Sequence, residues 1–230
     1  ILCVIISIFL VTAIFSVADM MIRTQSDRMT GKNGSWHIEL DGISQETALK
    51  IAERDDVVSI GAVTIFNPDG ELPYRMDGKR VVLYGIDESY LTMNSTGAAE
   101  GRFPQGVGEI MLSSNAARVL QVAVGDTVTL RTPSGDWDFT VSGLGGVEES
   151  YYSGQYSLMD AYLPRTAFAA LMEQNNVHNL QTSYYVQFTS ASKAAKAIPE
   201  LTAQHNLPEN AVSENTGVMA IAGHSDSSAA

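Results

Sequence analysis

The stretch VAVGDTVTLRTPSGDWDFTVSGL, residues 122–144, decides the fold of the middle of the chain. Apolar and polar residues alternate on both sides of a Pro-Ser-Gly-Asp break, which is the pattern of two antiparallel strands joined by a turn. Gly125 and Asp126 supply a tight turn into the first strand. Gly143 ends the second strand where a side chain would obstruct the next bend. The stretch therefore predicts a β-hairpin with one buried face.

Further short β segments surround this hairpin. They are KRVVLYGID (79–87), GEIMLS (108–113) and MDAYLP (159–164). Among these segments only SNAARVLQ, residues 114–121, has a helical pattern, with Ser114 or Asn115 as its N-cap. The middle of the chain is therefore predicted to be rich in strands and to hold one short helix.

A strand–helix–strand unit lies on each side of this block. The first unit comprises SWHIEL (35–40), the amphipathic SQETALKIAERD (44–55) and VVSIGAVTIF (57–66), and the second comprises SYYVQFTS (183–190), ASKAAKAIPELTAQHN (191–206) and PENAVSE (208–214). Ser44 is the expected N-cap of the first helix. Pro199 is expected to kink or restart the second helix, because proline lacks a backbone donor. Similar ends around a different middle predict one subdomain interrupted by another.

The predicted fold class is therefore α+β. Two strand–helix–strand units form one split α/β subdomain, residues 34–98 and 166–215, around a β-rich inserted subdomain with one short helix, residues 99–165. Residues 216–230 are expected to lead into a second membrane helix that lies beyond this sequence.

The first 22 residues are almost entirely apolar and carry one charge, Asp19. The uncharged run from Ile1 to Ala18 reaches the length that a membrane-spanning helix needs, so we predict a partial transmembrane helix over residues 1–22. The sequence is expected to be part of a longer chain. Two alternatives stay open: Ser-Val-Ala before Asp19 fits a signal-peptidase site, and the segment could also be a buried core helix.

Composition excludes several classes of function. The formal net charge is −12 with 14 Lys and Arg residues, and such an acidic surface repels nucleic acid. Cys3 is the single cysteine, and the four histidines lie far apart without metal-site spacing. A nucleophile motif and a phosphate-binding loop are also missing from the sequence. We therefore predict no catalytic, metal or cofactor-binding residues and no enzyme activity.

One segment is a candidate binding surface. Tyr151, Tyr152 and Tyr156 lie together in EESYYSGQYSLMDAYLP, and tyrosine supplies contact area at low cost in conformational entropy. Ordinary packing under a loop is the favoured interpretation of these tyrosines, and a partner-contact loop is the alternative.

The order of motifs in the middle block resembles the extracytoplasmic core domain of MacB/FtsX-like ABC transporter permeases. The pattern runs from Gly-Arg-aromatic through a short strand, a small helix and Gly-Asp-x-Val-x-Leu to Phe-x-Val-x-Gly and Tyr-x-Pro. The matching residues are Gly101, Arg102, Phe103, Glu109, Ile110, Ala117, Leu120, Gly125, Asp126, Val128, Leu130, Phe139, Val141, Gly143, Tyr162 and Pro164. The wider layout, an anchor followed by a split domain with a β-rich insert, is similar over nearly the whole chain.

This resemblance implies a transporter component in the cell membrane, with most of the chain on the extracytoplasmic side. It implies a separate cytoplasmic ABC ATPase subunit that binds the ATP, a second permease copy or homologue, and no cofactor in this chain. Members of the family couple ATP hydrolysis to movements outside the membrane, in export, lipoprotein or peptide-antibiotic handling, or signalling. The alternatives are the ligand-sensing outer domain of a receptor kinase and a secreted hydrolase.

Overall fold

The computed structural model describes residues 20, 24, 30, 31, 33–94, 97–145, 158–208 and 210–225. The transmembrane helix predicted over residues 1–22 lies outside the described residues, apart from Met20. Among the residues that the structure describes, no helix combines the length and the apolar character needed to cross a membrane.

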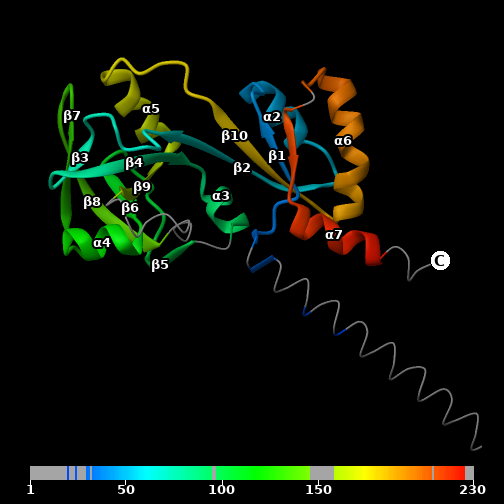
Figure 1. The fold of residues 1–230 in the computed structure, drawn as a ribbon, viewed down its shortest axis with the longest axis horizontal. Helices are drawn as coiled ribbons and strands as arrows, with labels where there is room; N and C mark the ends of the chain where they lie inside the picture. The colour runs from blue at the N-terminus through cyan, green and yellow to red at the C-terminus, as the bar shows by residue number, and fades with distance from the viewer. Residues whose placement is uncertain are drawn as a thin grey trace, which may run out of the picture.

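The described chain has a mixed α/β fold with one 11-stranded sheet (Figure 1). The strands are β1 (Ile38–Asp41), β2 (Val57–Phe66), β3 (Arg75–Met76), β4 (Lys79–Ile86), β5 (Ala98–Gly101), β6 (Glu109–Leu112), β7 (Thr127–Thr132), β8 (Gly135–Gly145), β9 (Leu158–Pro164), β10 (Thr182–Phe188) and β11 (Val212–Glu214). The helices are α2 (Gln45–Ala52), α3 (Glu88–Met93), α4 (Ser114–Leu120), α5 (Arg165–Gln174), α6 (Ala191–His205) and α7 (Thr216–Ser225).

One end of the sheet is an open antiparallel wing in the order β11-β1-β10-β2. Strands of the first unit alternate with strands of the second, since β1 pairs with both β10 and β11. Helices α2 and α6 cover one face, where alternate strand residues such as Ile38, Leu40 and Val186 are fully buried. Burial of these apolar faces is what holds the two units together.

The other end of the sheet curls into a barrel, because β4-β3-β7-β8-β6-β9 is closed by parallel pairing of β9 with β4. The hairpin predicted at residues 122–144 is confirmed: β7 and β8 pair antiparallel, with Leu130 opposite Trp137. Leu130, Phe139 and Val141 point into the barrel core and are almost completely buried. The strand pattern in the sequence therefore encodes the inner face of this barrel.

Strand β2 joins the two ends, because residues Val63 to Phe66 pair with β4 after the earlier residues of β2 have paired with β10. Helix α3 packs on β2 at Gly61. A Cβ at this position would lie 2.5 Å from the backbone N of Tyr90, so the close approach requires glycine. The wing and the barrel are thus parts of one hydrogen-bonded sheet.

Several local predictions need correction. The N-cap of α4 is Ser113, not Ser114 or Asn115, because its Oγ accepts from the Ala116 N–H at 3.1 Å. Helix α6 runs through Pro199 without restarting, since its buried face packs on the sheet on both sides of that residue. In addition to α4, the structure contains helices α3 and α5, which were not predicted. Both are short, and each directly follows the end of a strand.

Candidate functional site

The predicted turn residues lie around the barrel hairpin. Gly125 has φ +97°, and its N–H donates to the Val141 carbonyl at 2.8 Å. Asp126 accepts the Ala123 N–H at 2.8 Å. Gly143 does not end the second strand as predicted, because β8 continues to Gly145. A Cβ on Gly143 would lie 2.4 Å from the Arg102 carbonyl oxygen, so this strand can approach its neighbour only without a side chain.

The candidate contact residues Tyr151, Tyr152 and Tyr156 lie outside the described residues, so their role stays a prediction. Within the described ranges no group of three or more His, Cys, Asp or Glu residues could hold a metal ion. Among the histidines, His37 is buried; its Nδ1 accepts the Phe188 N–H at 3.1 Å, and burial lowers its pKa. This histidine fastens β1 to β10.

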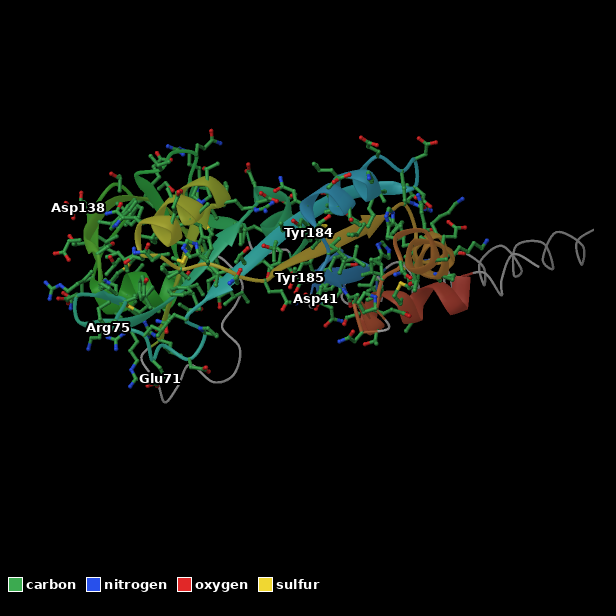
Figure 2. All side chains as sticks on the ribbon, turned by 90° about the horizontal axis from the view of Figure 1, so that it is seen from above. Asp41, Glu71, Arg75, Asp138, Tyr184 and Tyr185 are labelled. Carbon is green, nitrogen blue, oxygen red and sulfur yellow. The ribbon has the colours of Figure 1, made fainter. Side chains whose placement is uncertain are left out.

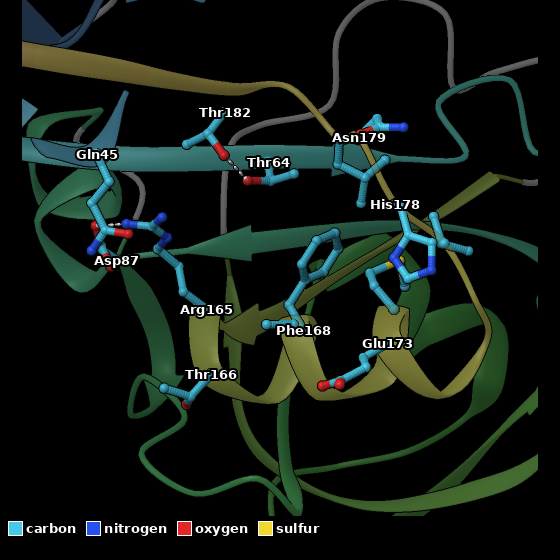
Figure 3. A pocket seen from close by; sticks show the side chains of 14 residues that line it. Gln45, Thr64, Asp87, Arg165, Thr166, Phe168, Glu173, His178, Asn179 and Thr182 are labelled. Atoms are coloured by element: carbon cyan, nitrogen blue, oxygen red, sulfur yellow. Dashed lines mark hydrogen bonds and ion pairs between the residues drawn. The ribbon is translucent and has the colours of Figure 1, made fainter. Parts of the chain in front are cut away.

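A cleft of about 720 Å³ lies where the wing meets the barrel, on the face that carries α2 (Figure 3). The start of α2 forms one side, α5 forms another, and β2 and β10 form the wall between them. The lining residues are Gln45, Thr64, Asp87, Arg165, Thr166, Phe168, Ala169, Met172, Glu173, Val177, His178, Asn179, Leu180 and Thr182. The volume lies within the range of about 300–1,000 Å³ that is usual for sites of small organic ligands.

Strand register brings the charged residues of the cleft together. The parallel pairing of Ile86 with Pro164 places the next residues, Asp87 and Arg165, side by side. Ala62 of β2 and Tyr184 of β10 are paired antiparallel, and both contribute to the surroundings of Asp87 and Arg165. Residues that are far apart in the sequence therefore meet at one end of the cleft.

At this end Arg165 is fixed from two sides. Its Nη1 lies 3.8 Å from Oδ2 of Asp87, and its Cζ lies 5.9 Å from the centroid of the Tyr184 ring. The Ala62 N–H donates to the same Oδ2 of Asp87 at 3.2 Å. Burial raises the pKa of the Asp87 carboxyl, and Arg165 partly opposes this effect. The pair is an oriented positive and negative charge facing the cleft.

Apart from this charged pair, the cleft is lined by apolar side chains, by the hydroxyl groups of three threonines, and by the polar side chains of Gln45, Glu173, His178 and Asn179. The Oγ1 atoms of Thr64 and Thr182 are hydrogen-bonded to each other at 2.7 Å. Phe168 is almost completely buried and packs against Gly85, where a Cβ would lie 2.5 Å from Cγ of the phenyl ring. Figure 3 shows Phe168 between the Asp87–Arg165 end and the opposite end, where Glu173 lies. The cleft can hold a small molecule with a charged head and an apolar body.

Comparison with known proteins gives the family of the chain. A sequence model described as "MacB-like periplasmic core domain" matches residues 1–204. The chain belongs to the MacB-like periplasmic core domain family. A search of curated proteins finds no match.

Solved structures share the fold of this MacB-like domain. The periplasmic region of MacB from Actinobacillus actinomycetemcomitans is 15% identical with a TM-score of 0.57; the match covers 81% of this chain and 92% of that one. The extracellular domain of the noncanonic ABC-type transporter YknZ from Gram-positive bacteria is 15% identical with a TM-score of 0.53. This match covers 78% of this chain and 98% of that one. At this identity the likeness concerns the fold.

The face of the wing opposite α2 and α6 carries an aromatic network in this MacB-like domain. Tyr185 makes edge contacts with Trp36 and Tyr90, at centroid distances of 4.9 and 5.0 Å, and its hydroxyl donates to Oε1 of Glu39 at 2.7 Å. Burial raises the pKa of Glu39, and burial together with the Glu39 hydrogen bond raises the pKa of Tyr185. Figure 2 shows Tyr184 and Tyr185 near the middle of the molecule, close to Asp41 of the wing, with Asp138 at the barrel end.

Neither this network nor the cleft was predicted from the sequence. Adjacent residues of a strand point to opposite faces, so Tyr184 and Tyr185 serve different sites. Two adjacent tyrosines in a strand indicate one aromatic side chain on each face of the sheet, and this was the available signal. Assigning each tyrosine to a face, however, needs the register of β10 against β1 and β2.

Proposed function

We propose that this chain is the extracytoplasmic domain of an ABC transporter permease, in which cytoplasmic ATP hydrolysis drives movements outside the membrane. The observation that carries the proposal is the family match over residues 1–204. The fold shared with the MacB and YknZ domains agrees with it. The partners would be a separate ATPase subunit and a second permease copy or homologue. The chain itself would bind no ATP and catalyse no reaction.

The arrangement of the two ends of the domain supports a mechanical role. The Nδ2 atom of Asn215, just before α7, donates to the carbonyl oxygens of Asn33 and Trp36 at 3.1 and 2.9 Å. The segment that enters the domain is therefore fastened to the segment that leaves it. Figure 1 shows both on the wing, at its lower edge, with the entry segment near α3. We call this fastening the base of the domain.

In this proposal residues 1–22 form the first anchor and residues 216–230 lead into the second. The split subdomain, residues 34–98 and 166–215, would stand on the base and carry the inserted subdomain, residues 99–165, outward. The hydrogen-bonded connection from β10 through β2 to β4 gives a stiff path from the base to the barrel. A displacement imposed at the base would therefore move the barrel.

Isolation of the protein with its natural partners tests the proposal. The full-length protein would be purified by an affinity tag from its own membranes, and the co-purified proteins would be identified by mass spectrometry. We expect an ABC ATPase subunit in amounts comparable to the tagged protein. Recovery of a histidine kinase, or of no ATPase under several mild detergents, would contradict the proposal.

A further inference from the structure

We propose that the cleft between α2, α5 and the sheet binds a free apolar α-amino acid. The ammonium group would pair with Asp87, the carboxylate with Arg165, and the side chain would lie against the wall formed by Phe168, Ala169 and Met172. This is a binding role in addition to the transmission of movement, and it does not depend on that function.

The charges at one end of the cleft set the chemistry of the ligand. Oδ2 of Asp87 and Nη1 of Arg165 are 3.8 Å apart, which is beyond hydrogen-bond distance. Asp87 and Arg165 therefore do not use up each other's hydrogen-bonding capacity, and both can bind a ligand. A single anion would be repelled by Asp87 and a single cation by Arg165, whereas a zwitterion with both charges on one carbon satisfies both groups.

The positions of Arg165 and Asp87 lower the entropic cost of binding a ligand. The guanidinium is held over the Tyr184 ring, and Asp87 is held by the Ala62 N–H, so neither group has to be ordered when a ligand arrives. The Asp87 and Arg165 side chains keep 41% and 31% of their exposure, so both remain reachable from the cleft.

The adjoining wall selects an apolar side chain. Phe168 and Met172 of α5 pack mainly into the barrel core and are 5% and 3% exposed, so only their edges line the cleft, and the exposed Ala169 lies beside them on the same wall. The amino acid would occupy the charged end of the 720 Å³ cleft and leave the opposite end, with Glu173 and His178, to solvent.

Isothermal titration calorimetry of the complete 230-residue chain with L-leucine tests this inference. N-acetyl-L-leucine lacks the ammonium group and L-leucinamide lacks the carboxylate. We expect each analogue to bind at least about tenfold more weakly than L-leucine, because each loses a charge-assisted hydrogen bond. Equal binding of leucine and leucinamide would overturn the assignment. So would no saturable heat from L-leucine up to about 10 mM, well above the dissociation constant of about 1 mM of a weak site.

Variants locate the site. Asp87→Asn keeps an oxygen for the Ala62 N–H and removes the charge, and Arg165→Gln removes the guanidinium; each is expected to weaken L-leucine binding at least about tenfold. Glu173→Gln removes one acidic charge at the opposite end of the same cleft and is expected to leave the affinity unchanged. Loss of binding in Glu173→Gln but not in the other two variants would contradict the proposed position. If a variant fails to fold, the comparison of the three ligands still decides.

Discussion

Replacing Asn215 with alanine is expected to loosen the base of the domain. Asn215 is 5% exposed, and its amide donates two hydrogen bonds, to the carbonyl oxygens of Asn33 and Trp36. Its Oδ1 also accepts the Val218 N–H at 3.4 Å, which is a weak contact. Each of the two amide bonds contributes about 0.5–1.5 kcal/mol, so Asn215→Ala should lower the free energy of unfolding by about 1–3 kcal/mol.

Urea denaturation of the full chain, followed by circular dichroism, measures this loss. For a domain of this size, a change of about 1 kcal/mol lowers Tm by about 2–4 °C, so thermal unfolding gives a second reading. Gln204→Ala, at an exposed position of α6, is the matched control and should change stability by less than about 0.5 kcal/mol. A loss in Asn215→Ala no larger than in Gln204→Ala would refute the reasoning that these bonds fasten the base.

Three further substitutions test the core, the close helix contact and an ion pair. Leu130→Ala removes a fully buried side chain of the barrel and should cost about 2–5 kcal/mol in urea unfolding. Gly61→Ala places a methyl group against the Tyr90 backbone and should cost about 1–3 kcal/mol, whereas Gly106→Ala, with open space around it, should cost little. A hydrogen bond from Arg102, helped by hydrogen bonds from the backbone N–H groups of Gln105 and Gly106, lowers the pKa of Glu109 to about 2. This carboxylate stabilises the fold above its usual pKa, and the stabilisation is lost as pH falls through about 2. The stability difference between wild type and Glu109→Gln should therefore be largest at neutral pH and shrink in acid, and a difference that grows as pH falls would contradict the assignment.

Local signals predicted much of the fold. The apolar run at residues 57–66 predicted β2 with the bounds that the structure shows. Ser44 was predicted to cap α2, and its Oγ accepts the Thr47 N–H at 3.1 Å. These predictions succeeded because a strand face and a helix cap are written in a few consecutive residues. The family resemblance also rested on consecutive motifs.

The two helices that were missed, α3 and α5, were missed for different reasons. Helix α3 has six residues, too few to establish a helical period, and is stabilised by packing on β2 at Gly61. Helix α5 was hidden by its position directly after strand β9, although Ala167, Phe168, Leu171 and Met172 share one buried face. Tertiary packing decided α3, whereas the helical spacing of the apolar residues in α5 was a local signal that was missed.

The cleft could not have been predicted from single residues. Its charged end exists because β4 and β9 pair in parallel, which places Asp87 beside Arg165. Nothing near either residue in the sequence indicates that register. Parallel pairing between strands that are distant in the chain is set by the closure of the whole barrel.

Movement of the barrel during the ATPase cycle is the central claim. It can be measured in nanodiscs that hold the complete permease with its ATPase, by energy transfer from a donor on the barrel to an acceptor lipid. The donor would be attached at Val107→Cys, an exposed barrel position, in a background in which Cys3 and any other native cysteine of the permease are replaced by serine. We expect ATP with vanadate to change the transfer efficiency, and a hydrolysis- and binding-deficient ATPase to abolish the change. Identical efficiencies in the nucleotide-free and trapped states would contradict the account.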